Sequence, residues 1–130
     1  MEQKLLLFCK DKISKIVKIL SEQNSDEVTE FQTTVQMVQV VINRLLNGKK
    51  QIVIDIPLLD RINVILGEYL GILEQFVQSG RLKRLLNSNR IRRRLEKINS
   101  DLHTQLKQFV EKLKELNTSG NSFNSSSRFD

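Results

Sequence analysis

The residues from Gly80 to Leu116 read GRLKRLLNSNRIRRRLEKINSDLHTQLKQFVEKLKEL, and this stretch combines one continuous apolar stripe with a concentration of positive charge. The stripe has an apolar side chain every third or fourth residue, at Ile91, Leu95, Ile98, Leu102, Leu106, Phe109, Leu113 and Leu116. This spacing predicts a helix with one apolar face about seven turns long. Such a face has to be covered by other helices, so the stretch predicts a helical bundle.

Three further segments have the same period and can supply those helices. They are expected at about residues 3–22, 25–47 and 57–79. Ser25 is the expected N-cap of the second helix, Gly48 ends it, and Asp55 or Ile56 precedes the first turn of the third, which contains Pro57. We therefore expect an all-α, up-down four-helix bundle with a short brace helix at Leu82–Leu86, between the third and fourth helices.

The three partner stripes define the expected core. They comprise Leu6, Cys9, Ile13, Ile16 and Leu20; Val28, Phe31, Val35, Val38, Ile42 and Leu45; and Leu59, Ile62, Leu66, Tyr69, Leu73 and Phe76. Leu58, Ile65, Ile72 and Val77 widen the third stripe, so the third helix is expected to be the most buried. Gly67 and Gly71 lie four residues apart on it, and this spacing predicts the close approach of a neighbouring helix.

The composition changes at Asn117. Residues 117–130 are rich in Ser, Asn and Gly and contain few large apolar side chains, so they cannot bury enough surface to order themselves. We expect one domain at residues 1–116, followed by a disordered tail or linker at residues 117–130 that folding does not require. A linker at this place suggests that the chain is the front end of a longer protein.

Composition also indicates a compartment. The one cysteine, Cys9, lies within an apolar stripe and has no partner for an internal disulfide, which favours a reducing compartment. The N-terminus lacks the long apolar run of a signal peptide, and no stretch is apolar for long enough to cross a bilayer. These features predict a cytoplasmic protein.

No catalytic or metal-binding pattern is present. The single histidine, His103, falls on the flank of the last stripe, where a solvated or half-buried side chain is expected. There is no paired cysteine, glycine-rich phosphate loop or nucleophile motif. We expect a protein that is not an enzyme and that uses neither a cofactor nor a metal.

Positive charge is concentrated in one short stretch. Residues 81–97 contain eight basic residues and one acid, Glu96, a local net charge of +7 in a chain whose total is +6. On a helical wheel Arg93 points directly away from the core and Arg92 falls on one flank, near Glu96. The predicted anion-binding set is Arg81, Lys83, Arg84, Arg90, Arg93, Arg94 and Lys97.

The run LLNGKKQIVIDIPLLDRINVILGEYLGILEQFVQSGRLKRLLNSNRIRRRLEKINSDLHTQLKQF, which begins at Leu45, resembles the N-terminal four-helix bundle of mixed-lineage kinase domain-like proteins and related HeLo-like adaptor domains. The shared features are the loop with Gly48, Lys49 and Pro57, the brace at Leu82–Leu86 and the pattern at Asn99–Leu102. The likeness implies a module that precedes a kinase or pseudokinase domain. It also implies oligomerisation and binding to phosphoinositide-rich membranes through basic residues, in some members with cell death. Here no kinase domain is present, and the basic residues are more concentrated than in the animal proteins.

Three functions follow as hypotheses. The first is a non-enzymatic signalling bundle, peripherally associated with membranes, that oligomerises and binds anionic lipid headgroups. The second is an adaptor that binds a helical protein partner without acting at a membrane. The third is binding to a nucleic-acid backbone, which is disfavoured because residues 81–97 contain no aromatic side chain to stack on bases and no DNA-binding motif. A solvated basic face without a partner is the alternative to all three.

Overall fold

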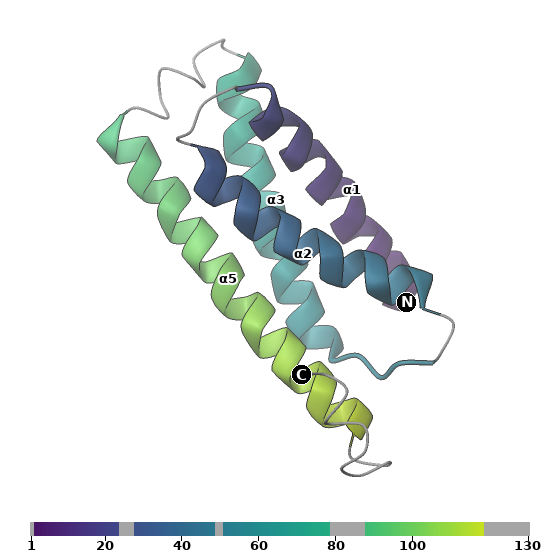
Figure 1. Ribbon diagram of the computed structural model, residues 1–130. Coiled ribbons are helices and arrows are strands. Elements are labelled where there is room, and N and C mark those ends of the chain that lie inside the picture. Colours follow the sequence, from purple (N-terminus) through teal and green to yellow (C-terminus); the bar gives the residue numbers. More distant parts are fainter. Residues whose placement is uncertain (1, 24–27, 49–50, 79–87, 119–130) are drawn as a thin grey trace.

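Four long helices form the protein: α1 (Glu2–Ser21), α2 (Thr29–Asn47), α3 (Ile56–Gln78) and α5 (Asn89–Thr118), shown in Figure 1. The computed structural model describes residues 2–23, 28–48, 51–78 and 88–118, and no strand occurs among them. The predicted all-α four-helix bundle is confirmed. The predicted brace at Leu82–Leu86 lies outside the described residues.

Neighbouring helices are not always consecutive in the chain. α1 and α3 run in one direction and α2 and α5 in the other (Figure 1). α1 packs on both α2 and α3, and α3 packs on α5, whereas α2 and α5 share a much smaller contact. α2 and α3 therefore lie diagonally across the bundle. Their aromatic rings still meet at its centre, where Phe31 and Tyr69 pack edge to face with their centroids 6.4 Å apart.

The predicted stripes form the core. Their members are buried except at the ends, where Leu45, Phe76, Ile91, Leu113 and Leu116 are half-buried. Val77 was predicted to widen the third stripe, but its side chain is 42% exposed. The prediction is wrong here because the described helices leave Val77 uncovered in the last turn of α3. Periodicity thus identified most of the core, but it included the exposed Val77 and missed Leu70, which is buried on α3.

The helix ends follow local capping chemistry in part. Asp55 caps α3 as expected: its Oδ1 accepts the N–H of Leu58 at 3.0 Å, and Pro57 lies in the first turn. α2 ends at Asn47 as predicted, and Gly48 is extended (φ −67°), so it does not need the left-handed conformation. α2 begins at Thr29 rather than at residue 25 or 26. The cap position is held by Val28, whose side chain is buried and makes no capping hydrogen bond; Ser25 itself lies outside the described residues.

The glycine pair on α3 does not admit a neighbouring helix. A Cβ atom at Gly67 would lie 3.7 Å from the Nζ of Lys12, and one at Gly71 would meet no atom within 4 Å. The predicted close approach is therefore wrong. The flexible side chain of Lys12 occupies the space by Gly67, and its Nζ donates a 2.7 Å hydrogen bond to Oδ1 of Asn63, which ties α1 to α3.

The end of α5 is fixed to the loop that precedes α3. α5 continues to Thr118, two residues past the expected end at Leu116. Asn117 donates from Nδ2 to the carbonyl oxygen of Val53 at 2.8 Å and accepts the N–H of Val53 at Oδ1 at 2.8 Å. This two-way amide pair makes Asn117 part of the bundle.

Candidate functional site

Four of the predicted anion-binding residues, Arg90, Arg93, Arg94 and Lys97, lie in the first three turns of α5. The carbonyl of Ser88 accepts the N–H of Arg92 at 2.9 Å, so the helix starts in the predicted polar cap region. Leu95 and Ile98 are buried in the core cluster, and α5 packs on α3. Burial of these two side chains fixes the rotation of α5 about its axis. The basic side chains on the other side of the helix, those of Arg90, Arg93, Arg94 and Lys97, consequently face outward.

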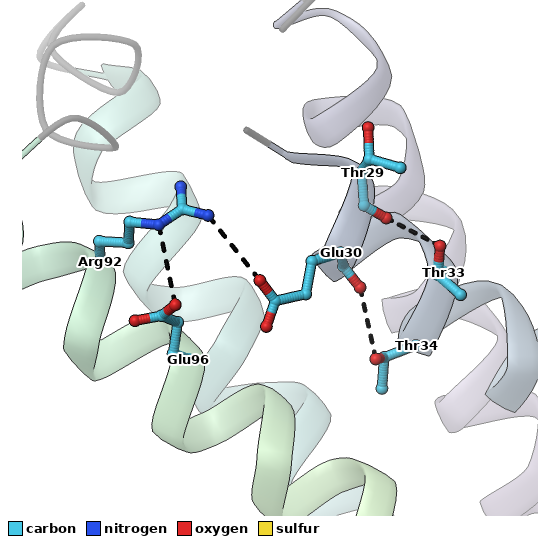
Figure 2. A network of polar contacts seen from close by, with 6 residues as sticks. All are labelled: Thr29, Glu30, Thr33, Thr34, Arg92 and Glu96. Atoms are coloured by element: carbon cyan, nitrogen blue, oxygen red, sulfur yellow. Dashed lines mark hydrogen bonds and ion pairs between the residues drawn. The ribbon is translucent and has the colours of Figure 1, made fainter. Parts of the chain in front are cut away.

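Arg92 is the basic residue of this run that serves the fold (Figure 2). Its Nη2 lies 3.8 Å from Oε2 of Glu30 on α2, and its Nε lies 3.8 Å from Oε2 of Glu96 on α5. Its guanidinium also sits 5.5 Å from the centre of the Phe31 ring. The pairing with Glu96 agrees with the predicted flank position, whereas Glu30 could not be identified from the sequence. Arg92 therefore holds α2 and α5 together where both helices begin.

The other four described cations of the run behave differently. Arg90, Arg93, Arg94 and Lys97 are all exposed. Among the described residues no acidic side chain comes within 4.0 Å of any of them. Successive residues are separated by 100° around a helix, so these four share a sector of roughly 100° on the outer surface of α5. Arg81, Lys83 and Arg84, which complete the predicted set, lie outside the described residues.

This arrangement is unfavourable for the helix itself. The pairs Arg90–Arg94 and Arg93–Lys97 place like charges four residues apart, which costs a few tenths of a kcal/mol each. The first turn of α5 contains no acid, so the positive end of the helix dipole faces further positive charge. A surface selected for stability alone would carry acids here. The four cations, which we call the basic face, are thus suited to an external anion.

One edge of the basic face is electrostatically mixed. Arg94 and Lys97 line a shallow cleft of about 430 Å³ between α3 and α5, beside the bare backbone of Gly71. Glu68 and Asp101 line the same cleft. An anion would be repelled by these carboxylates, so the side of the basic face that carries Arg90 and Arg93 is the better anion site.

A second feature, an apolar groove between α2 and α5, was not predicted. It has a volume of about 620 Å³, and Met37, Val40, Val41, Leu106 and Val110 form its apolar lining. The available signal was a second group of apolar residues on α2, at Met37, Val40 and Val41, beside the stripe that enters the core. Recognising it as a groove required knowing that α2 and α5 contact each other only slightly.

The structure also places the single cysteine and the single histidine of the chain. Cys9 is fully buried, and burial raises the pKa of its thiol to about 11, so it is protonated at neutral pH. This confirms its role as a core side chain. His103 is exposed on the rim of the apolar groove, as its flank position predicted. No group of three or more His, Cys, Asp or Glu side chains in the described part of the chain could hold a metal ion.

The described helices include none that is long and apolar enough to cross a membrane. Comparison of the chain with protein families, with curated proteins and with solved structures found no match. The resemblance to the mixed-lineage kinase domain-like bundle therefore stays a prediction.

Proposed function

We propose that the protein is a non-enzymatic signalling bundle that associates peripherally with anionic membranes through the basic face of α5. The observation that carries this proposal is that basic residues close together in the sequence differ in whether they form ion pairs within the fold. Arg92 is paired with Glu30 and Glu96, whereas Arg90, Arg93, Arg94 and Lys97 are exposed and have no ion pair among the described residues. Cations that were needed only for the fold would be paired as Arg92 is.

A lipid surface suits the shape of this face. The four cations lie exposed along one side of α5, and the mixed cleft that Arg94 and Lys97 line is shallow. Phosphorylated headgroups at a bilayer surface can approach such a face side by side. Each cation near an anionic leaflet contributes about 1 kcal/mol, so four give about 4 kcal/mol, which corresponds to a Kd of about 1 mM for one bundle.

Millimolar affinity is weak, so several bundles would have to act together. Linking two or more copies makes later binding events intramolecular and raises the overall affinity by orders of magnitude. Oligomerisation is therefore part of the proposal. It would come from a second copy of this bundle or from another part of a longer chain, and regulation of the oligomer would then control membrane binding.

Vesicle co-sedimentation at physiological salt tests the proposal. Wild-type protein should bind vesicles that contain a phosphoinositide more strongly than phosphatidylserine vesicles of matched charge, and should not bind neutral vesicles. The variant R90E/R93E/K97E should lose this binding while keeping its helical circular dichroism. The matched control is K4E/K10E/K18E, which makes the same charge change on α1, diagonal to α5, and should still bind.

Three outcomes would overturn the proposal. The first is wild-type protein that stays in the supernatant when phosphoinositide vesicles are sedimented. The second is equal loss of binding in both triple variants, which would indicate a net-charge effect. The third is binding of a short DNA or RNA duplex at the same salt, with a strong salt dependence, while vesicles are not bound. That last result would favour the nucleic-acid hypothesis.

A further inference from the structure

We propose that the apolar groove between α2 and α5 is a docking site for an amphipathic helix of another protein, one whose flanks carry acidic residues. The groove is independent of the basic face. It lies toward the C-terminal half of α5, whereas the basic face occupies the first turns. If the protein does not bind membranes, the proposal that this groove binds a helix still stands.

The way α2 and α5 meet creates the groove. The ion pair of Glu30 with Arg92 joins the two helices where they begin. From there α2 and α5 diverge toward their C-terminal ends (Figure 1), and their contact is small compared with that between the other neighbouring helices. Two helices that diverge in this way leave apolar side chains without a covering helix.

Two of those apolar side chains are largely exposed. Met37 is 43% exposed and Val40 is 52% exposed, both on the α2 wall. The groove continues past the shared residues Val41 and Val110 into a second hollow of about 330 Å³, which reaches Leu113 and Ile52. Contiguous exposed apolar surface with a polar rim is typical of a protein-binding site.

The dimensions suit a helix. On the α5 wall the lining residues recur at positions 103, 106, 107, 110, 111 and 114, and on the α2 wall at 37, 40, 41 and 44. Both sets have the three-and-four spacing of a helical face. The α5 set spans about 16 Å, the length of a helix of about 11 residues. An apolar stripe with this period can interdigitate with both walls, as in other helix-in-groove complexes.

The charge of the rim selects the kind of helix. Arg44 and Lys107 lie along it, against one acid, Glu111. A helix that carries Glu or Asp beside its apolar stripe would place carboxylates opposite these cations, whereas one with Lys in the same places would be repelled. The occupant is therefore an acid-flanked amphipathic helix.

Two synthetic peptides of about 14 residues, one turn longer than the groove, test this. Each has Leu at positions spaced four, three and four residues apart; the flanking positions are Glu in one peptide and Lys in the other. With isotope-labelled full-length protein, we expect the Glu peptide to shift amide resonances around Val40 and Val110. It should bind at least about tenfold more tightly than the Lys peptide at low salt, a difference of about 1.4 kcal/mol.

Three variants sharpen the test. V40E should abolish binding of the Glu peptide, whereas V64E, at a valine of equal exposure on α3 (52%), should leave it unchanged. Because both valines are half-exposed, neither change should disturb the core, and circular dichroism would check this. R44E/K107E should reverse the preference, so that the Lys peptide binds better.

Other occupants predict other results, each of which overturns the proposal. Equal binding of both peptides would show that the charge of the rim does not select the helix. Resonance shifts that map elsewhere would show that the peptide binds outside the groove. A concentration-dependent dimer that V40E dissociates would make a second copy the occupant. Peptide binding that appears only after removal of residues 119–130 would assign the groove to the chain's own C-terminal segment.

Discussion

Tyr69 brings a polar group into the centre of the bundle without a hydrogen-bond partner. Its ring is fully buried against Phe31, and its hydroxyl has no partner among the described residues. Burial raises the pKa of the Tyr69 phenol far above its ordinary value, and the nearby carboxylate of Glu30 adds to the shift. Burial likewise raises the pKa of the Cys9 thiol, from 9.0 to about 11. Both groups are neutral when protonated, so the folded state retains protons that the unfolded chain releases.

These two residues predict a loss of stability in alkali. Above about pH 9 the unfolded chain binds fewer protons than the native state, so the free energy of unfolding falls as pH rises; the thiol alone contributes up to about 2 kcal/mol by pH 11. Urea denaturation at pH 7, 9 and 10.5 measures this fall. C9A should reduce the slope and Y69F should reduce it further, with little effect of either substitution on the slope below pH 8.

The same experiment tests the unpaired hydroxyl. At pH 7, Y69F should be neutral or should stabilise the protein by up to about 1 kcal/mol, because it removes a buried polar group that makes no hydrogen bond and keeps the ring contact. A loss of more than about 1 kcal/mol would show that the hydroxyl has a hydrogen-bond partner in solution.

At the scale of elements, helical periodicity identified the four helices and their core because an apolar stripe is a property of one segment alone. Features that depend on two segments were harder to predict. The pairing of Arg92 with Glu30 joins residues on different helices, and the groove by Val40 depends on the divergence of α2 from α5. Gly67 and Gly71 were misinterpreted for the same reason, because their spacing does not reveal what lies opposite.

The end of α5 offers a test of a single interaction between elements. Asn117 makes two hydrogen bonds of 2.8 Å to Val53 and one of 2.7 Å to the carbonyl of Leu113. A chain ending at Thr118 should have the same Tm as the full chain, since it retains these hydrogen bonds. N117A, or a chain ending at Leu116, should lose about 1 kcal/mol, or roughly 4 °C in Tm, because the site is partly exposed to competing water.

Thermal denaturation of the three proteins followed by circular dichroism decides between the alternatives. If removal of residues 119–130 by itself lowers Tm by more than the further loss of Asn117, the C-terminal segment packs on the bundle, and the boundary of the folded unit lies beyond Thr118.

For the molecule as a whole, the two proposed binding surfaces are separated along α5. The basic face occupies the start of the helix, where Arg92 also holds α2 and α5 together, and the apolar groove lies beside the later turns. A bundle of this kind could bind a membrane and a partner helix at the same time. The basic run was evident in the sequence as a local charge of +7. The sequence did not show which of these cations form ion pairs within the fold, because that depends on the position of α2.

Neighbouring arginines test this separation most directly. Arg92 and Arg93 are adjacent in the chain, yet Arg92 is paired on the inner flank and Arg93 is exposed and unpaired among the described residues. R92Q and R93Q remove the same charge, so a net-charge effect cannot distinguish them. Two quantities are measured for wild type and both variants: the partition coefficient onto phosphoinositide vesicles and the free energy of unfolding.

R92Q should lose about 1–2 kcal/mol of stability, since it breaks two ion pairs and a cation–π contact, and should bind vesicles as wild type does. R93Q should keep or slightly gain stability and bind about fivefold more weakly, the equivalent of about 1 kcal/mol. Equal loss of vesicle binding in the two variants, or a larger loss in R92Q, would contradict the account.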